Sequence, residues 1–265
     1  MPNDPIESQS GDAPTAASDK RLAGKTALIT GAARRVGAAI ARTLHAAGAN
    51  TVLHYRSSSE DAAELAREFN HARPGSAAVV SGDLLDIDKI PALATAATQA
   101  FGGLDILVNN ASSFYPTPVG DITELDWDDL IGTNLKAPLF LSQAAAPALH
   151  LNQGLVLNLA DIHGMRPLRR HPVYSVAKAG LIMLTKSLAR ELGPHVRVNA
   201  IAPGPVLWPD DGLDKALQAE IIDRTALKRP GTASDVARAA LFFAAEAPYV
   251  TGQILAVDGG RSVGW

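Results

Sequence analysis

The sequence predicts an α/β fold: a single-domain, doubly wound parallel sheet of about seven strands with helices on both faces. From residue 25 onward, short apolar runs alternate with longer segments of helical periodicity. Strands separated by helices need crossover connections, and crossovers produce parallel strands that are covered on both faces. No linker-like stretch interrupts residues 25–265, so we expect one domain.

Seven apolar runs are the strand candidates, at residues 26–30, 51–54, 77–80, 104–108, 155–159, 196–200 and 253–257. Six helices are expected between them. In the first, apolar residues recur every four positions from Val36, and Gly48 ends it. The others are expected over or near residues 61–69, 90–101, 123–150, 172–192 and 233–245.

Composition excludes several classes of function. With 47% hydrophobic and 19% charged residues, the chain can bury a sizeable core. The net charge is −3 and no basic block is present, so we expect no nucleic-acid partner. The absence of cysteine excludes disulfides, thiolate metal sites and a cysteine nucleophile, and it fits a reducing compartment. The seven histidines form no His-Glu-x-x-His pair, and we expect no metal.

The first 22 residues are expected to form a flexible polar tail ahead of a domain at residues 23–265. They are rich in Pro, Ser and Asp and lack the apolar segment of a secretory signal. An alternative is an arm that docks on another subunit. No run reaches the roughly 18 apolar residues that span a bilayer, so we expect no membrane partner and a cytoplasmic location.

A glycine turn follows the first strand. Gly31 and Gly37 flank the start of a helix, where glycine lets the backbone approach a pyrophosphate and the helix N-terminus offers free N–H groups. On the first strand of a βαβ unit, this pattern predicts dinucleotide binding rather than a plain turn. Arg35 stands where the usual turn has glycine; it would bring a charge to the phosphates and a donor to the reaction site, unless it is an ordinary surface arginine.

The segment after the second strand predicts NADP rather than NAD. NAD-binding turns are normally followed, about 20 residues on, by an acid for the ribose 2′-hydroxyl. Here residues 54–59 contain no acid, and an arginine with several hydroxyls suits a 2′-phosphate, although a solvated loop is the alternative. The expected ligands are His54, Tyr55, Arg56, Ser57 and Ser58.

Tyr174 and Lys178 are four residues apart and therefore share one face of a helix. A nearby ammonium favours the phenolate and should lower the pKa of the tyrosine. Such a pair can transfer a proton while a cofactor transfers a hydride. Asp161 precedes Tyr174 by 13 residues at the end of a strand, where open parallel sheets bind ligands, although a capping aspartate is the alternative.

In combination, these motifs resemble the short-chain dehydrogenase/reductase family over about residues 24–260. The resemblance implies a Rossmann-type fold, with Asp83 and Leu84 near the adenine and Asn110 and Ala111 in the cofactor groove. It also implies that Asn134 holds a proton-relay water and that Lys178 binds the nicotinamide ribose. The same groove is expected to include Val36, Ser112, Pro203, Gly204 and Val206.

Two departures from the family pattern resemble its pteridine reductase branch. Asp161 replaces the usual serine and Arg35 replaces a glycine, and residues 109–118 are similar to that branch's motif. The resemblance implies that Phe114 stacks on a pterin, that Arg35 reaches pterin and phosphates, and that Asp161 orients or protonates Tyr174. The Arg-Ser loop is a residue shorter than in some members. Phe114 could instead be an ordinary loop aromatic that covers the core.

The expected function is NADPH-dependent reduction of a C=N bond in a pterin, dihydropterin or dihydrofolate. An ionised carboxylate at Asp161 cannot donate to a ketone oxygen and would repel an oxyanion, which disfavours the alternative, a carbonyl or 3-oxoacyl reductase. A non-catalytic NADP-binding regulator is the alternative of another class. Trp208 falls where this fold places its substrate lid, and it would either form a wall of the pterin pocket or pack the lid onto the body of the protein. His163 and His171 have no assigned role.

By the same resemblance, we expect a homotetramer. The helix that carries Tyr174 has an apolar stripe that could pair across a two-fold axis, as could the helix at residues 138–149. The stripe consists of Ala177, Leu181, Leu184 and Leu188.

Overall fold

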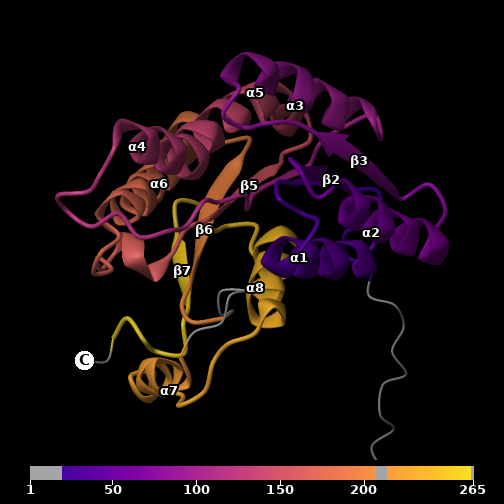
Figure 1. The fold of residues 1–265 in the computed structure, drawn as a ribbon. Coiled ribbons are helices and arrows are strands. Elements are labelled where there is room, and N and C mark those ends of the chain that lie inside the picture. Colours follow the sequence, from indigo (N-terminus) through magenta and orange to yellow (C-terminus); the bar gives the residue numbers. More distant parts are fainter. Residues whose placement is uncertain (1–19, 207–213, 264–265) are drawn as a thin grey trace, which may run out of the picture.

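A computed structural model describes residues 20–206 and 214–263. Within these residues, seven parallel strands form one sheet in the order β3-β2-β1-β4-β5-β6-β7 (Figure 1). This confirms the predicted doubly wound sheet. The strands are β1 (Thr26–Ile29), β2 (Asn50–Tyr55), β3 (Ala77–Ser81), β4 (Ile106–Asn109), β5 (Leu155–Leu159), β6 (Arg197–Pro203) and β7 (Ile254–Val257).

Helices cover both faces of the sheet, as Figure 1 shows. One face carries α1 (Arg35–Ala46), α2 (Ser59–Ala72) and α8 (Ala233–Ala245). The other carries α3 (Ile90–Gln99), α5 (Ala137–Leu151) and α6 (Pro172–Glu191). The helix α4 (Glu124–Ile131) packs beside α6, and α7 (Lys215–Asp223) follows the segment outside the described residues.

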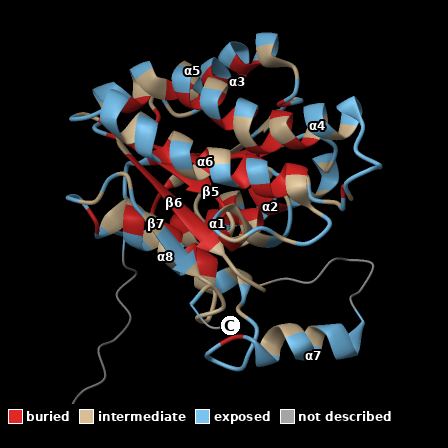
Figure 2. Cartoon of the chain, turned by 90° about the vertical axis from the view of Figure 1, so that its left-hand side faces the viewer, coloured by how far each residue is buried: buried red, intermediate tan, exposed pale blue. Residues whose placement is uncertain are grey.

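Successive residues of the central strands enter opposite cores. Ala27 and Ile29 pack under α1 and α8, whereas Leu28 packs under α3 and α5. The strands therefore read as continuous apolar runs rather than alternating ones, and they are the most buried part of the molecule in Figure 2. The order reverses between β1 and β4, which places a ligand crevice at the carboxyl ends of these strands.

The single helix expected at residues 123–150 is three segments. A π-helical turn, Gly132–Lys136, separates α4 from α5. The side chain of Asn134 donates from Nδ2 to the Leu130 carbonyl at 2.9 Å, and this carbonyl is the partner that an α-helix would give to the Asn134 N–H. Apolar periodicity could not reveal this local change in helix type.

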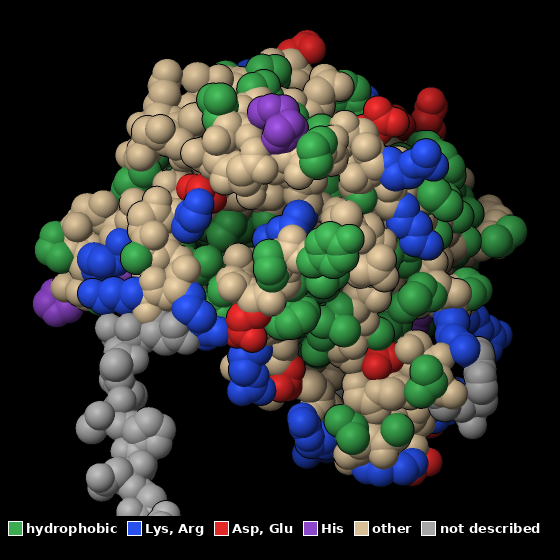
Figure 3. Space-filling model, turned by 180° about the vertical axis from the view of Figure 1, so that it is seen from behind, with side chains coloured by type: hydrophobic (Ala, Val, Ile, Leu, Met, Phe, Trp, Pro, Cys, Tyr) green, Lys and Arg blue, Asp and Glu red, His purple; other side chains and the backbone are tan. Residues whose placement is uncertain are grey.

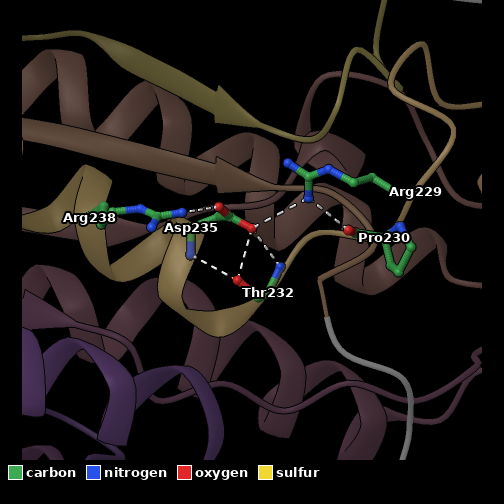
Figure 4. A network of polar contacts seen from close by, with 5 residues as sticks. All are labelled: Arg229, Pro230, Thr232, Asp235 and Arg238. Atoms are coloured by element: carbon green, nitrogen blue, oxygen red, sulfur yellow. Dashed lines mark hydrogen bonds and ion pairs between the residues drawn. The ribbon is translucent and has the colours of Figure 1, made fainter.

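The start of α8 illustrates how local sequence fixes an element (Figure 4). Thr232 and Asp235 form a capping box, in which each side chain accepts a backbone N–H of the other residue. Arg238 donates to Asp235 at 2.5 Å, and Arg229 lies 3.9 Å from its other oxygen. No such signal pointed to α7, because it buries none of its side chains and so lacks an inward apolar face.

Two expectations about packing need correction. Leu22, assigned to the tail, is 3% exposed and packs into the core under α1. The stripe expected at a subunit interface faces the chain's own body, since its residues, Ala177, Leu181, Leu184 and Leu188, are buried or partly buried against the hydrophobic clusters. The large apolar residues that α6 does expose are Val176 and Met183.

Charges of both signs are interspersed on the face seen in Figure 3, without a continuous basic area. None of the helices in the described residues is both long and apolar enough to cross a membrane. Across the same residues, no group of three or more His, Asp or Glu side chains could hold a metal ion.

Candidate active site

The glycine turn is closely packed, as phosphate binding requires. Gly31 has φ of +60°, a left-handed conformation that glycine adopts without strain. A Cβ at Gly37 would lie 2.2 Å from the Gly31 carbonyl oxygen and 2.6 Å from Asn110 Nδ2. The helix N-terminus of α1 can approach β1 and β4 this closely only because position 37 has no side chain.

Thr30, which is not among the expected site residues, holds the turn to β4. Its Oγ1 accepts the backbone N–H of Asn110 at 2.9 Å and of Ala111 at 3.0 Å. Asn110 in turn donates from Nδ2 to the carbonyls of Thr30 and Gly31. The signal was the Thr-Gly pair at the strand end, because a buried hydroxyl there can satisfy N–H groups of the neighbouring strand.

His54 supports the turn from behind instead of facing the cleft. It is 2% exposed, and its Nδ1 lies 3.3 Å from the Gly31 nitrogen while Nε2 lies 3.2 Å from the Gly82 carbonyl. Burial lowers the pKa of His54 to about 4, so the ring is neutral and Nδ1 can accept the Gly31 N–H. The structure thus makes His54 a positioning residue rather than a direct ligand.

Arg35 is exposed at the first position of α1, with φ of +54°. This left-handed conformation is unfavourable for residues other than glycine, and it explains why the family usually has glycine there. Val36, next along, is half-buried and packs against the core under α1.

The expected 2′-phosphate ligands gather between the end of β2 and the start of α2. Arg56 and Ser57 are exposed, and Ser58 is the N-cap of α2. Asp61, an acid in the first turn of α2, is paired with Arg34 at 2.6 Å, which reduces its repulsion of an anion. Tyr55 ends β2 and is half-buried.

The other residues expected to bind the cofactor follow the ends of β3, β4 and β6. Asp83 accepts the Leu85 N–H at 3.0 Å, and Leu84 is buried under α3. Ala111 and exposed Ser112 follow Asn110. Beyond β6, Gly204 donates to the Val257 carbonyl at 3.0 Å, a Cβ there would lie 2.6 Å from the Asp258 Cβ, and Val206 packs against the core. Pro203 ends β6, whereas Trp208 lies outside the described residues.

Asp161 and Tyr174 form a hydrogen-bonded pair at the end of β5. The Tyr174 hydroxyl donates to Asp161 Oδ2 at 2.8 Å, and Asp161 Oδ1 accepts the His163 N–H at 2.8 Å. Lys178 is buried one turn further along α6; its Nζ donates to the Leu159 carbonyl at 2.8 Å and lies 5.6 Å from the Tyr174 ring centre.

The pKa of Tyr174 differs from the expectation that Lys178 lowers it. Burial, and then the negative charge of Asp161, raise the pKa of Tyr174 well above its ordinary value. Burial also lowers the pKa of Lys178 to about 8. At neutral pH the phenol is therefore protonated and can serve as a proton donor, next to a lysine that remains mostly charged.

Asn134 lies in the π-helical turn, which packs against the helix α6 that carries Tyr174. Its Nδ2 donates to the Ser113 carbonyl at 2.9 Å, which fixes the segment before Phe114. Its Oδ1 is buried and accepts no hydrogen bond within residues 20–206 and 214–263. A buried acceptor of this kind suits an ordered water, the group that the resemblance places here.

Phe114 and His171 form an aromatic wall next to Tyr174. The two rings stack with centres 4.8 Å apart and planes 9° apart, and the Phe114 ring meets the edge of Tyr174 at 4.8 Å. Phe114 remains 49% exposed, so part of it can still contact a ligand. No sequence signal predicts that His171 stacks on Phe114, because His171 precedes α6 whereas Phe114 follows β4.

The arrangement fits a nicotinamide dinucleotide. The crowded glycine turn meets a helix N-terminus for the pyrophosphate, and the Tyr174–Lys178 pair lies at the same carboxyl edge of the sheet. A Cβ at Gly37 would close the phosphate cradle, as the 2.2 Å approach to Gly31 shows.

Comparison with known proteins gives the class. Residues 31–262 match the family model described as enoyl-(acyl carrier protein) reductase. The chain belongs to the short-chain dehydrogenase/reductase family, and it is an NAD(P)-dependent oxidoreductase. The resemblance noted from the motifs is thereby confirmed.

Among curated relatives, pteridine reductase 1 of Leishmania tarentolae is 35% identical, with 89% of this chain and 96% of the relative covered. The 3-oxoacyl-(acyl-carrier-protein) reductase of Staphylococcus aureus is also 35% identical, covering 89% and 97%. A 3beta-hydroxysteroid dehydrogenase 1 of Eggerthella lenta is 38% identical, covering 91% and 95%. Identity alone therefore does not select one substrate.

Two solved structures share the fold closely. One is a blue fluorescent protein from a metagenomic library in complex with NADPH, with a TM-score of 0.86, 32% identity, and 91% and 99% of the two chains covered. The other is a short chain dehydrogenase from Burkholderia cenocepacia in complex with NADP, with a TM-score of 0.86, 34% identity, and 91% and 99% covered.

Proposed function

We propose that the protein is an NADPH-dependent reductase of a pterin, dihydropterin or dihydrofolate C=N bond. The observation that carries the proposal is the 2.8 Å hydrogen bond between the Tyr174 hydroxyl and the Asp161 carboxylate. A carboxylate at this position stabilises positive charge, and a C=N nitrogen that gains a proton becomes positive. A ketone develops negative charge instead, which the same carboxylate would repel.

In this mechanism, Tyr174 releases the proton and Asp161 holds its hydroxyl in position. A bound dihydronicotinamide would supply the hydride to the carbon of the C=N bond. The Tyr174 proton goes to the nitrogen, and Lys178 stabilises the resulting phenolate, since its ammonium is near the ring and mostly charged at neutral pH. Asn134, with its buried Oδ1, would hold the water that returns a proton to Tyr174.

Two features support a preference for NADPH over NADH. The Arg56 guanidinium is exposed, with no ion pair or hydrogen bond to another described residue, so it can meet a 2′-phosphate. Of the two acids in the first turn of α2, Asp61 is paired with Arg34, and Glu60 stands four residues after Arg56 rather than at the end of β2. The NADPH and NADP in the two solved structures are consistent with this preference.

A carbonyl or 3-oxoacyl reductase is the second candidate, favoured by a 35% identical relative of that activity. One assay separates the two: NADPH oxidation followed at 340 nm with dihydrobiopterin, dihydrofolate and an acetoacetyl thioester. The proposal expects the pterins to react faster. Faster reduction of the thioester ketone would replace it with the second candidate. No activity on any of the three would favour a non-catalytic NADP-binding role.

A further inference from the structure

The segment that follows Asp161 and runs through α6 carries charges of one sign only. Residues 162–190 contain six Lys and Arg residues and no Asp or Glu. Arg169 and Arg170 are exposed, and neither guanidinium has an ion pair or hydrogen bond within the described part of the chain. By contrast, exposed Arg42 and Arg238 are paired with carboxylates at 2.7 and 2.5 Å. We call Arg169 and Arg170 the arginine rim.

The arginine rim is attached to the aromatic wall formed by Phe114 and His171. Its backbone accepts two contacts from that wall: Thr117 donates its N–H to the Arg170 carbonyl at 2.7 Å, and His171 Nδ1 lies 2.9 Å from the Arg169 carbonyl. The His171 ring in turn stacks on Phe114. The rim is therefore one residue away from the aromatic wall that faces Tyr174.

The chain keeps an arginine at position 170 despite its backbone conformation. Arg170 has φ of +67°, a region in which glycine would be less strained. Arg35, at the start of α1 after the glycine turn, shows the same feature with φ of +54°. A conformational cost at a position next to the aromatic wall is consistent with a role for the side chain itself.

Nearby acids do not neutralise the rim. The helix α4, which packs beside α6, carries Glu124, Asp126, Asp128 and Asp129, and none of these acids is paired with Arg169 or Arg170 among the described residues. Asp126 caps its own helix through Thr123, and the Ser113 hydroxyl donates to Asp129 at 3.3 Å. The two rim guanidiniums therefore remain available to an anion from solution.

We propose that the arginine rim binds carboxylates on the tail of the substrate, so that the preferred substrate is a pterin conjugated to an acidic tail. This inference rests on the proposed pterin reductase function. In this proposal the ring lies beside Phe114 and Tyr174, and a long substituent extends past His171 toward the rim, which directly precedes His171 in the chain. Guanidinium groups bind carboxylates through paired hydrogen bonds, and the glutamate of dihydrofolate carries two carboxylates, whereas the side chain of dihydrobiopterin is neutral.

The experiment compares dihydrofolate with dihydrobiopterin in the full-length protein and in the double variant Arg169→Gln/Arg170→Gly. We expect the KM for dihydrofolate to rise about 3–20-fold, the worth of two exposed ion pairs, with kcat retained. The KM for dihydrobiopterin should stay constant. A higher salt concentration should raise the KM for dihydrofolate in the unmodified protein but not in the double variant. Arg190→Gln, which removes a charge from the far end of α6, is the control for overall charge.

Two glycine variants separate strain from recognition. Arg170→Gly and Gln153→Gly each relieve a positive φ, of +67° and +50°, and each should raise Tm by about 2–4 °C. Gln153 lies just before β5, at the amino ends of the strands, whereas Arg170 follows the carboxyl end of β5. Only Arg170→Gly should raise the KM for dihydrofolate; an equal KM in both variants would contradict a binding role.

The possible failures are distinguishable. If both pterins react and the double variant leaves the KM for dihydrofolate unchanged, this inference is wrong while the proposed function stands. If neither pterin reacts, the proposed function fails and the inference fails with it. If the variant instead raises the KM for an acetoacetyl group on acyl carrier protein, the rim binds an acidic carrier protein, which also overturns the inference.

Discussion

The cofactor turn and the substrate wall are built on different principles. At the turn, Thr30, Asn110 and His54 are short or flat side chains whose hydrogen bonds are made to neighbouring backbone. At the wall, Phe114 is half exposed and the arginine rim is unpaired within the described residues. The first region is complete before any ligand arrives, whereas the second leaves groups available. The comparison indicates that the cofactor turn is preorganised, whereas the choice of substrate depends on side chains that are still exposed.

The largest expected effect lies where the two regions meet. Asp161→Ser should reduce pterin reduction by about 10²–10⁴-fold, the usual worth of a general acid or base, while NADPH binding stays nearly intact. Tyr174→Phe should be at least as damaging, and the double variant should lose little more, because residues that act as a unit are not additive. Steady-state kinetics and NADPH titration measure both quantities. Full pterin activity in Asp161→Ser would end the pterin assignment.

Gly37→Ala tests whether the cofactor turn is as tightly built as its contacts indicate. The new Cβ would meet backbone at 2.2 Å, which must shift the turn. Overpacking costs about 1–3 kcal/mol, so NADPH should bind roughly 5–100-fold more weakly by fluorescence titration. Gly103→Ala is the matched control, because its Cβ would meet only the end of the Asn152 side chain at 3.2 Å. Equal affinities in the two variants would contradict the argument.

Arg56→Asp should separate the two cofactors. The loss of charge-assisted hydrogen bonds to the 2′-phosphate, worth about 1.5–3 kcal/mol, should weaken NADPH by roughly 10–100-fold and affect NADH much less. Dissociation constants for both cofactors provide the measurement. Arg67→Asp, an exposed change on the outer part of α2, should leave both constants unchanged. If the unmodified protein bound NADPH and NADH equally well, the predicted preference would be wrong.

Lys178→Met should abolish activity yet increase thermal stability at pH 7. Burial lowers the pKa of Lys178 to about 8 from 10.5, so the buried charge destabilises the folded state by at most about 3 kcal/mol. Between pH 8 and 10.5 the unfolded chain binds more protons, so wild-type stability rises with pH from this group. The difference in Tm between Lys178→Met and the unmodified protein should therefore become smaller between pH 8 and 10.5. Loss of the Leu159 contact would offset part of the gain.

The pH dependence of kcat should follow the titration of Lys178. As pH rises through about 8, Lys178 loses its charge and no longer stabilises the phenolate, so kcat should fall. A kcat that rises across this pH range would contradict the role of Lys178.

Oligomeric state is expected to respond most weakly to single changes. We predict a homotetramer, with exposed Val176 and Met183 of α6 as apolar residues available to a second copy. Light scattering at micromolar concentration measures the mass, and Met183→Glu should shift it toward smaller species. A monomeric mass for the unmodified protein would refute the prediction.

Much of the fold was predictable because it rests on local patterns. Each of the seven expected strands forms, and the periodic helices begin and end within a few residues of their expected bounds. The elements that the sequence did not predict lack such a pattern. The helix α7 has no inward apolar face, and the π-helical turn at Asn134 depends on one side-chain contact. The stripe on α6 was correctly identified as apolar, but its partner is the chain's own body.

The sequence by itself determined the strand–helix order, the glycine turn and the types of residue available for proton transfer, because spacing along the chain encodes these. Only the tertiary structure decided how they act together. It turned His54 inward to support Gly31, and it brought His171 onto Phe114 from another element. It also buried Tyr174 beside Asp161, which raises the pKa of the phenol against the effect expected from Lys178. Burial and contacts between distant parts of the chain set these orientations and this pKa, and the spacing of residues along the chain predicts neither burial nor such contacts.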